Sequence, residues 1–202
     1  MSQHPDFLRF AAAFRAGRHD EALSLIDGLL AEFPQQAALH WHRANCLEAL
    51  GRFDEIESAL QRVLEVQPDF VPAIVKRVQF ANFAEDDDHW DEDISDAERE
   101  RRDAAAEAQA LARSRWAEGE LRRALALQGD HVDALAALSA VLHGRGDAVA
   151  TTEAEALLAR ALELAPGRVD LLETRARWRR SAAARYDDGP DDADTVSTWS
   201  GQ

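Results

Sequence analysis

Apolar residues recur at helical spacing along most of the chain, in pairs of short segments separated by turns that contain glycine. Positions three and four apart lie on one face of a helix, so each segment predicts an amphipathic helix with a buried stripe. The predicted helices cover residues 7–16, 20–32, 71–83, 96–127, 152–164 and 169–185, with two more inside 37–70 and one starting near 132. The pattern predicts an all-α protein.

The first two helix pairs repeat each other at a fixed distance. Gly17 and Gly51 are 34 residues apart, and so are Pro34 and Pro68. A 34-residue unit with a glycine turn between two apolar helices and a closing proline resembles the tetratricopeptide repeat. A single helix pair cannot bury its own apolar stripe, so such units stack on one another.

The resemblance implies a right-handed α-solenoid of about four helix-turn-helix repeats. We expect the solenoid to cover residues 1–185, with repeats at 3–36, 37–70, 71–131 and 132–167, and a capping helix at 168–185. An acidic insert, residues 84–98, interrupts the third repeat, whose second helix is extended backwards, with Ser95 and Glu98 as a predicted capping box. A turn with about three extra residues is expected before 152–164, and an acidic tail follows at 186–202.

Composition adds a strong asymmetry of charge to this picture. The net charge is −15, and the two acidic segments 84–98 and 186–202 hold nine and five carboxylates with no Lys or Arg, which leaves 24 acidic and 23 basic residues elsewhere. A chain without a basic footprint argues against nucleic-acid binding. Cys46 is the only cysteine, so the chain forms no internal disulfide, which fits a reducing compartment. No segment has the length and hydropathy of a membrane span. We therefore expect a cytoplasmic protein with no membrane association.

In the family that the sequence resembles, the first helix of each repeat lines a concave groove. The repeat register implies an apolar groove with a few polar groups, suited to an extended or helical peptide. Its predicted residues are Phe7, Phe14, Trp41, Asn45, Val75, Lys76, Gln79, Phe83 and His143. One subset of the family clamps a terminal carboxylate with cationic residues, but Trp41, Asp133 and Ala137 stand at those positions, so that clamp is absent.

Each acidic segment also contains one tryptophan, Trp90 or Trp199. Two interpretations are open: both segments are solvated runs, or each is a docking element that places its tryptophan in a groove and its carboxylates on arginines such as Arg179 and Arg180.

The sequence therefore predicts a protein-interaction module, an adaptor or chaperone-like protein that binds a protein or peptide. No catalytic motif, cofactor motif or metal-site spacing is present in it, so we expect no enzyme, no cofactor and no metal site. The alternatives are a self-assembling protein that uses its acidic tail, a chaperone of the type III secretion kind, and an acidic mimic of nucleic acid. Association of two or more copies also stays open.

Overall fold

A computed structural model describes residues 4–81 and 95–187, with side chains through Ala183. This part of the chain consists of helices joined by short turns. They are α1 (Pro5–Arg15), α2 (His19–Glu32), α3 (Ala37–Ala49), α4 (Phe53–Val66), α5 (Val71–Ala81), α6 (Asp96–Leu127), α7 (Val132–Arg145), α8 (Ala148–Leu164) and α9 (Val169–Asp187). The expected all-α, solenoid-like fold is confirmed, while the handedness and the limits of the repeats stay predictions.

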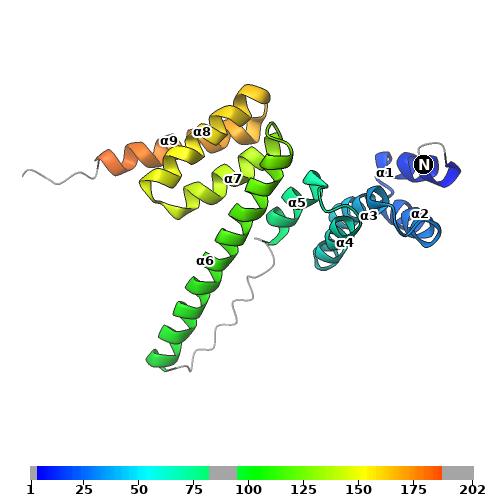
Figure 1. The fold of residues 1–202 in the computed structure, drawn as a ribbon, viewed down its shortest axis with the longest axis horizontal. Coiled ribbons are helices and arrows are strands. Elements are labelled where there is room, and N and C mark those ends of the chain that lie inside the picture. Colours follow the sequence, from blue (N-terminus) through cyan, green and yellow to red (C-terminus); the bar gives the residue numbers. More distant parts are fainter. Residues whose placement is uncertain (1–3, 82–94, 188–202) are drawn as a thin grey trace, which may run out of the picture.

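The helices pack as consecutive neighbours along an elongated body. Contacts join α1 to α2, α2 to α3, α3 to α4 and so on to α9, and α5 also touches α7. The pair α1 and α2 lies at one end of the molecule, and α8 with α9 lies at the other (Figure 1). This is the arrangement expected when each helix pair buries its stripe against the next.

The turns of the first two repeats have the same hydrogen bonds. The Gly17 N–H donates to Phe14 O and the Arg18 N–H to Ala13 O, and after α3 Gly51 and Arg52 bond in the same way to Glu48 and Leu47. This is a Schellman motif, which requires a left-handed residue at its penultimate position. Both glycines fill that position, with φ of 73° and 70°.

The core consists of three clusters that follow one another along the stack and are linked by partly buried side chains such as Leu64 and Leu125. Ile26, Leu47, Ile56 and Leu60 are among the fully buried side chains of its first part. A second part joins α5 to α8 through Val78, Leu121 and Leu142, and a third joins α7 and α8 to Leu171 of α9. The apolar stripes seen in the sequence are therefore the buried faces of the helices.

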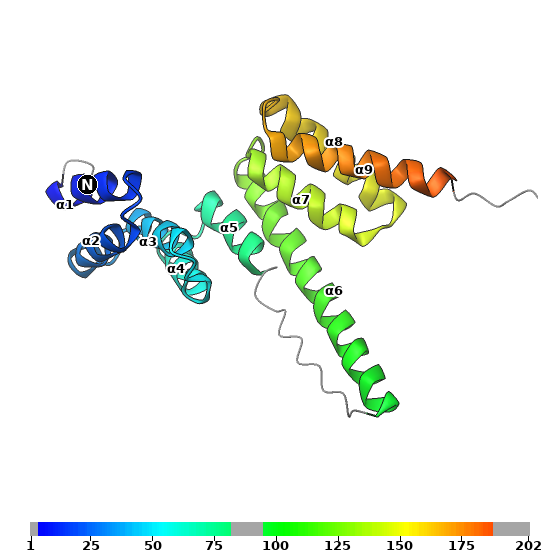
Figure 2. The same ribbon diagram turned by 180° about the vertical axis from the view of Figure 1, so that it is seen from behind.

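Helix α6 is the longest helix of the described chain and only its C-terminal part belongs to this core. Ala117, Leu121 and Ala124 are buried, whereas every residue from Asp96 to Ala112 is exposed. The N-terminal half extends away from the other labelled helices in both views (Figures 1 and 2). The predicted backward extension of this helix is thus observed with the expected bounds.

Two local predictions are wrong. Ser95 is the N-cap of α6, but its side chain makes no capping hydrogen bond. The Ser95 carbonyl accepts from the N–H groups of Glu98 and Arg99. The other free N–H groups of this exposed helix end are left to solvent. Helix α8 starts at Ala148 rather than residue 152, because the Asp147 carboxylate caps it by accepting from the Ala150 N–H at 2.8 Å.

Candidate binding surface

Trp41, Asn45 and Lys76, three of the predicted groove residues, lie together between α3 and α5. The Lys76 ammonium donates to Asn45 Oδ1 at 2.7 Å and lies 4.9 Å from the centroid of the Trp41 ring. It also forms an ion pair with Glu48, and its side chain is only 14% exposed. The charge of this lysine is therefore already paired inside the protein, and the half-buried Trp41 ring packs against Phe70 at 5.5 Å.

The phenylalanines of α1 take part in helix packing. Phe7 contacts Phe10 and the His42 ring of α3, with centroids 5.5 Å apart in each case, and Phe14 lies 5.2 Å from the His19 ring of α2. Phe7 and Phe14 are half-buried. Burial also lowers the pKa of His42 from its ordinary value. Much of this predicted aromatic surface is used to hold the first repeat on the second.

A cleft of about 640 Å³ lies between α5, α6, α7 and α9. Its floor consists of small side chains of α7, among them Ala136, Ala140 and Gly144. Gln79 of α5, a predicted groove residue, lines one wall. Arg113 and Ser114 of α6 form another, and Asp170 and Thr174 of α9 close the end. The lining of the cleft therefore combines apolar side chains, many of them small, with polar groups of α5, α6 and α9.

His143, predicted to face the groove, lies under a ring from the next repeat. Its imidazole stacks on the Trp178 indole of α9, with centroids 3.9 Å apart and planes 10° from parallel. The contact joins the end of α7 to α9 beside the cleft. Its role in the described structure is therefore to hold α9 in place.

The remaining predicted residues divide into three groups. Val75 is 2% exposed and lies in the core, so it offers no surface to a ligand. Arg179 and Arg180 are exposed on α9, away from the cleft lining. Phe83, Trp90 and Trp199 lie outside the described residues.

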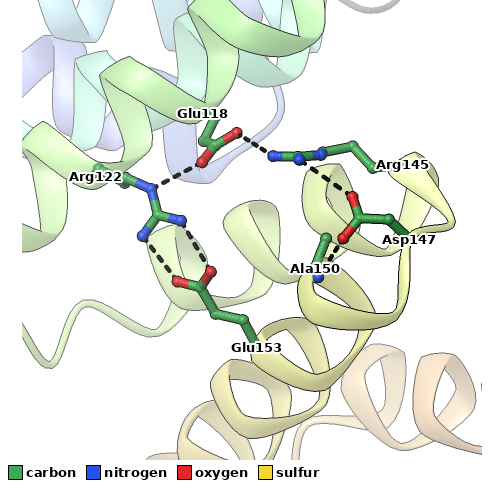
Figure 3. Close-up of polar contacts among 6 residues, drawn as sticks. All are labelled: Glu118, Arg122, Arg145, Asp147, Ala150 and Glu153. Atoms are coloured by element: carbon green, nitrogen blue, oxygen red, sulfur yellow. Dashed lines mark hydrogen bonds and ion pairs between the residues drawn. The ribbon is translucent and has the colours of Figure 1, made fainter.

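A network of ion pairs fixes α6, the wall of the cleft, on α7 and α8 (Figure 3). Arg122 of α6 donates to both carboxylate oxygens of Glu153 on α8, at 2.8 and 2.9 Å, and to Glu118 on its own helix. Glu118 also accepts from Arg145, which pairs with Asp147 at 3.1 Å. The hydrogen bond from Arg122 lowers the pKa of Glu153, and the Ala150 N–H lowers that of Asp147, so both stay charged at neutral pH.

Two features of the site were missed from the sequence. Arg113 and Ser114 belong to the cleft only because α6 continues backwards past the start expected for a second helix, and its length was the available signal. Nothing in the sequence singled out Trp116, whose ring centroid lies 5.1 Å from the Arg77 guanidinium, and Trp178 was interpreted only as an apolar position of the capping helix.

Comparisons with known proteins agree with the helical repeat fold. Residues 13–76 match a family described as tetratricopeptide repeat. No curated protein matches the sequence.

Several solved structures are similar over nearly the whole chain. MamA from Desulfovibrio magneticus RS-1, from residue 41 to its end, has a TM-score of 0.59 at 13% identity, covering 90% of this chain and 89% of that one. TTC0263, a thermophilic TPR protein of Thermus thermophilus, has 0.56 at 22% identity, covering 90% and 82%. YrrB, described as a TPR protein with an unusual peptide-binding site, has 0.57 at 13%, covering 85% and 73%. At these identities the likeness shows the fold.

Proposed function

Because this chain carries tetratricopeptide repeats and has the fold of tetratricopeptide repeat proteins, we propose that it is a protein-interaction module. Its ligand is a segment of another protein, and the segment lies in the cleft between α5, α6, α7 and α9. The role is that of an adaptor or a chaperone-like protein, without catalysis. We place this activity in the cytoplasm. Among the helices of the described residues, none combines the length and the apolar character of a membrane span.

The cleft is the observation that carries this proposal. Its volume of about 640 Å³ falls in the range of preformed ligand sites. The α7 floor presents Ala136, Ala137 and Ala140, whose short side chains leave room above the helix. Large apolar side chains of a bound segment fill such a space well, because burial of each contributes about 1.5–3 kcal/mol.

The walls suggest how the main chain of the segment is held. Gln79, Ser114 and Thr174 supply amide and hydroxyl groups around the apolar floor. Polar groups of this kind satisfy the N–H and C=O groups of a bound segment, which are costly to bury unpaired. The supported ligand is thus a peptide with bulky apolar side chains, whether extended or helical. The peptide-binding site named for YrrB is consistent with this proposal.

Filling the cleft tests the proposal. Random peptides displayed on phage are first selected on the full chain, and their affinities are then compared on two variants. Ala140→Trp places a large ring on the cleft floor, while Ala159→Trp makes the same change on the exposed face of α8, outside the cleft lining. We expect selected peptides to bind Ala140→Trp at least about tenfold more weakly than Ala159→Trp, since an occupied floor removes apolar burial worth about 1.4 kcal/mol or more.

Both variants should keep the helical circular dichroism of the original chain, which shows that the fold is intact. Equal affinity of the selected peptides for the two variants would place the binding surface elsewhere. Failure to select any peptide would contradict the proposal itself.

A further inference from the structure

Helix α9, expected to be a capping helix, begins like the first helix of a further repeat. Val132-Asp133-Ala134-Leu135 at the start of α7 is matched 37 residues later by Val169-Asp170-Leu171-Leu172 at the start of α9. Arg168 ties the two starts together by donating to Asp133 at 2.9 Å and to Asp170 at 2.7 Å. Within the described residues no second helix follows α9 to complete the unit.

The face that a second helix would cover is therefore open. On α7, Leu135 and Leu142 are 4% and 1% exposed, and each lies in a core cluster that includes residues of α8. The matching positions on α9 are Leu172, which is 37% exposed, and Arg179, which is also exposed. Figure 2 shows α9 at the end of the body opposite α1 and α2, crossing in front of α8.

The chemistry of this face differs from that of α7. Arg179 replaces the buried Leu142, and Arg175 and Arg180 lie on either side of it. In the part of the chain that is described, none of these three arginines forms an ion pair, and all are exposed. The stretch 175–185 holds five arginines and no carboxylate. A second α9 would repel such a face, whereas a segment with carboxylates and an apolar side chain complements it.

We propose that the open face of α9, formed by Leu172, Ala176 and Arg179 with Arg175 and Arg180 at its edges, binds residues 188–202 of the same chain. These residues directly follow α9, as α8 follows α7, and they contain four aspartates and Trp199. The carboxylates pair with the arginines, and the indole covers Leu172. This surface lies outside the cleft lining, so it adds a second binding surface to the proposed one.

The length of the segment allows this contact. From Asp187 back to Leu172 is 15 residues of helix, or about 22 Å. From Asp188 to Trp199 is 11 residues, which span up to about 36 Å when extended. The indole can thus reach Leu172 with chain to spare. An acidic segment of a partner that offers a similar pattern would compete for the same face.

Peptide binding in trans tests this assignment. The acceptor is the full chain with a neutral tail, in which Asp188, Asp191, Asp192 and Asp194 are replaced by Asn and Trp199 by Ser. The probe is a fluorescein-labelled peptide of residues 188–202, and its anisotropy is measured at low and high salt against a scrambled peptide. We expect the neutral-tail chain to bind the probe, more weakly at high salt, and the original chain to bind it at least about tenfold more weakly because its own segment occupies the face.

Two further variants of the neutral-tail chain locate the site. Leu172→Ser and Arg179→Gln should each weaken binding of the probe, whereas the matched exposed changes Leu8→Ser and Arg62→Gln should not. Ala140→Trp should also leave the probe's affinity unchanged, which separates this proposal from the cleft.

Three results would overturn the proposal. The probe could bind no better than its scrambled control, or bind the original and neutral-tail chains equally, or bind Leu172→Ser and Arg179→Gln without loss. Light scattering checks the assigned occupant: a dimer of the original chain that is lost with the neutral tail would mean that the segment docks on a second copy instead.

Discussion

At the scale of single residues, backbone conformation and burial explain why particular side chains occur where they do. Gly51 has a φ of 70° and closes the Schellman motif after α3, while Gly28 lies in the interior of α2 with ordinary helical geometry. A Cβ added at either position meets no atom within 4 Å. The two glycines thus differ in conformation and not in available space.

Alanine should therefore have opposite effects at these positions. Gly51→Ala should lower the free energy of unfolding by about 1–2 kcal/mol, because an L-residue is strained in the left-handed region. Gly28→Ala should raise it by up to about 1 kcal/mol, because alanine is the better helix former. Urea denaturation followed by circular dichroism measures both, and a destabilised Gly28→Ala or a stabilised Gly51→Ala would contradict the assigned backbone.

His42 should give the protein part of its sensitivity to acid. Its ring is packed against Phe7 and Phe10, and burial lowers its pKa below the ordinary 6.5. The imidazole of the unfolded chain therefore takes up a proton at a higher pH than that of the folded chain. As a result, the free energy of unfolding falls as the pH drops below 6.5. His42→Gln should reduce the loss of stability between about pH 7 and pH 5 in urea titrations; an unchanged loss would show that this ring is not responsible.

At the scale of helices, the sequence predicted the order and type of elements well. Periodic leucines and alanines, the glycines at 17 and 51 and the closing prolines all act locally, so a single sequence is enough to reveal them. The start of α8 was missed because Asp147 caps it through its side chain, a use of aspartate that its turn-like surroundings concealed.

Helix α6 should have two parts that differ in protection. Residues 96–112 are exposed, whereas Ala117, Leu121 and Ala124 are buried in the core and Arg122 is tied to Glu153. Backbone hydrogen bonds in an exposed helical segment open more readily than those in a packed one. Hydrogen exchange followed by mass spectrometry should show faster exchange at 96–108 than at 115–127. Equal protection of the two parts would mean that another element covers the extension.

At the scale of the whole molecule, the stack of repeats creates a cleft that no single repeat contains. Its lining comes from the successive helices α5 to α9, so the repeat register could place Gln79 there but not Arg113. The same limit explains His143, which was predicted to face the groove: the Trp178 ring that stacks on it comes from a later helix, which the register of α7 does not reveal. Val75 was placed in the groove by register alone, and packing puts it in the core instead.

A repeat array should also respond locally to damage. Ile26 is fully buried between the first helices, so Ile26→Ala should cost about 2–5 kcal/mol. Because stability in a solenoid is transmitted between neighbours, exchange should rise most in α1 to α3 and least in α7 to α9. A uniform rise along the chain would indicate a single cooperative unit.

Photo-cross-linking can detect contact between a bound segment and the cleft floor. A photo-reactive amino acid is placed at position 140, on the floor, or at position 159, on the exposed face of α8, and each chain is irradiated with a selected peptide bound. We expect the peptide to cross-link to position 140 and not to position 159. Cross-linking at 159, or at neither position with the peptide bound, would contradict it.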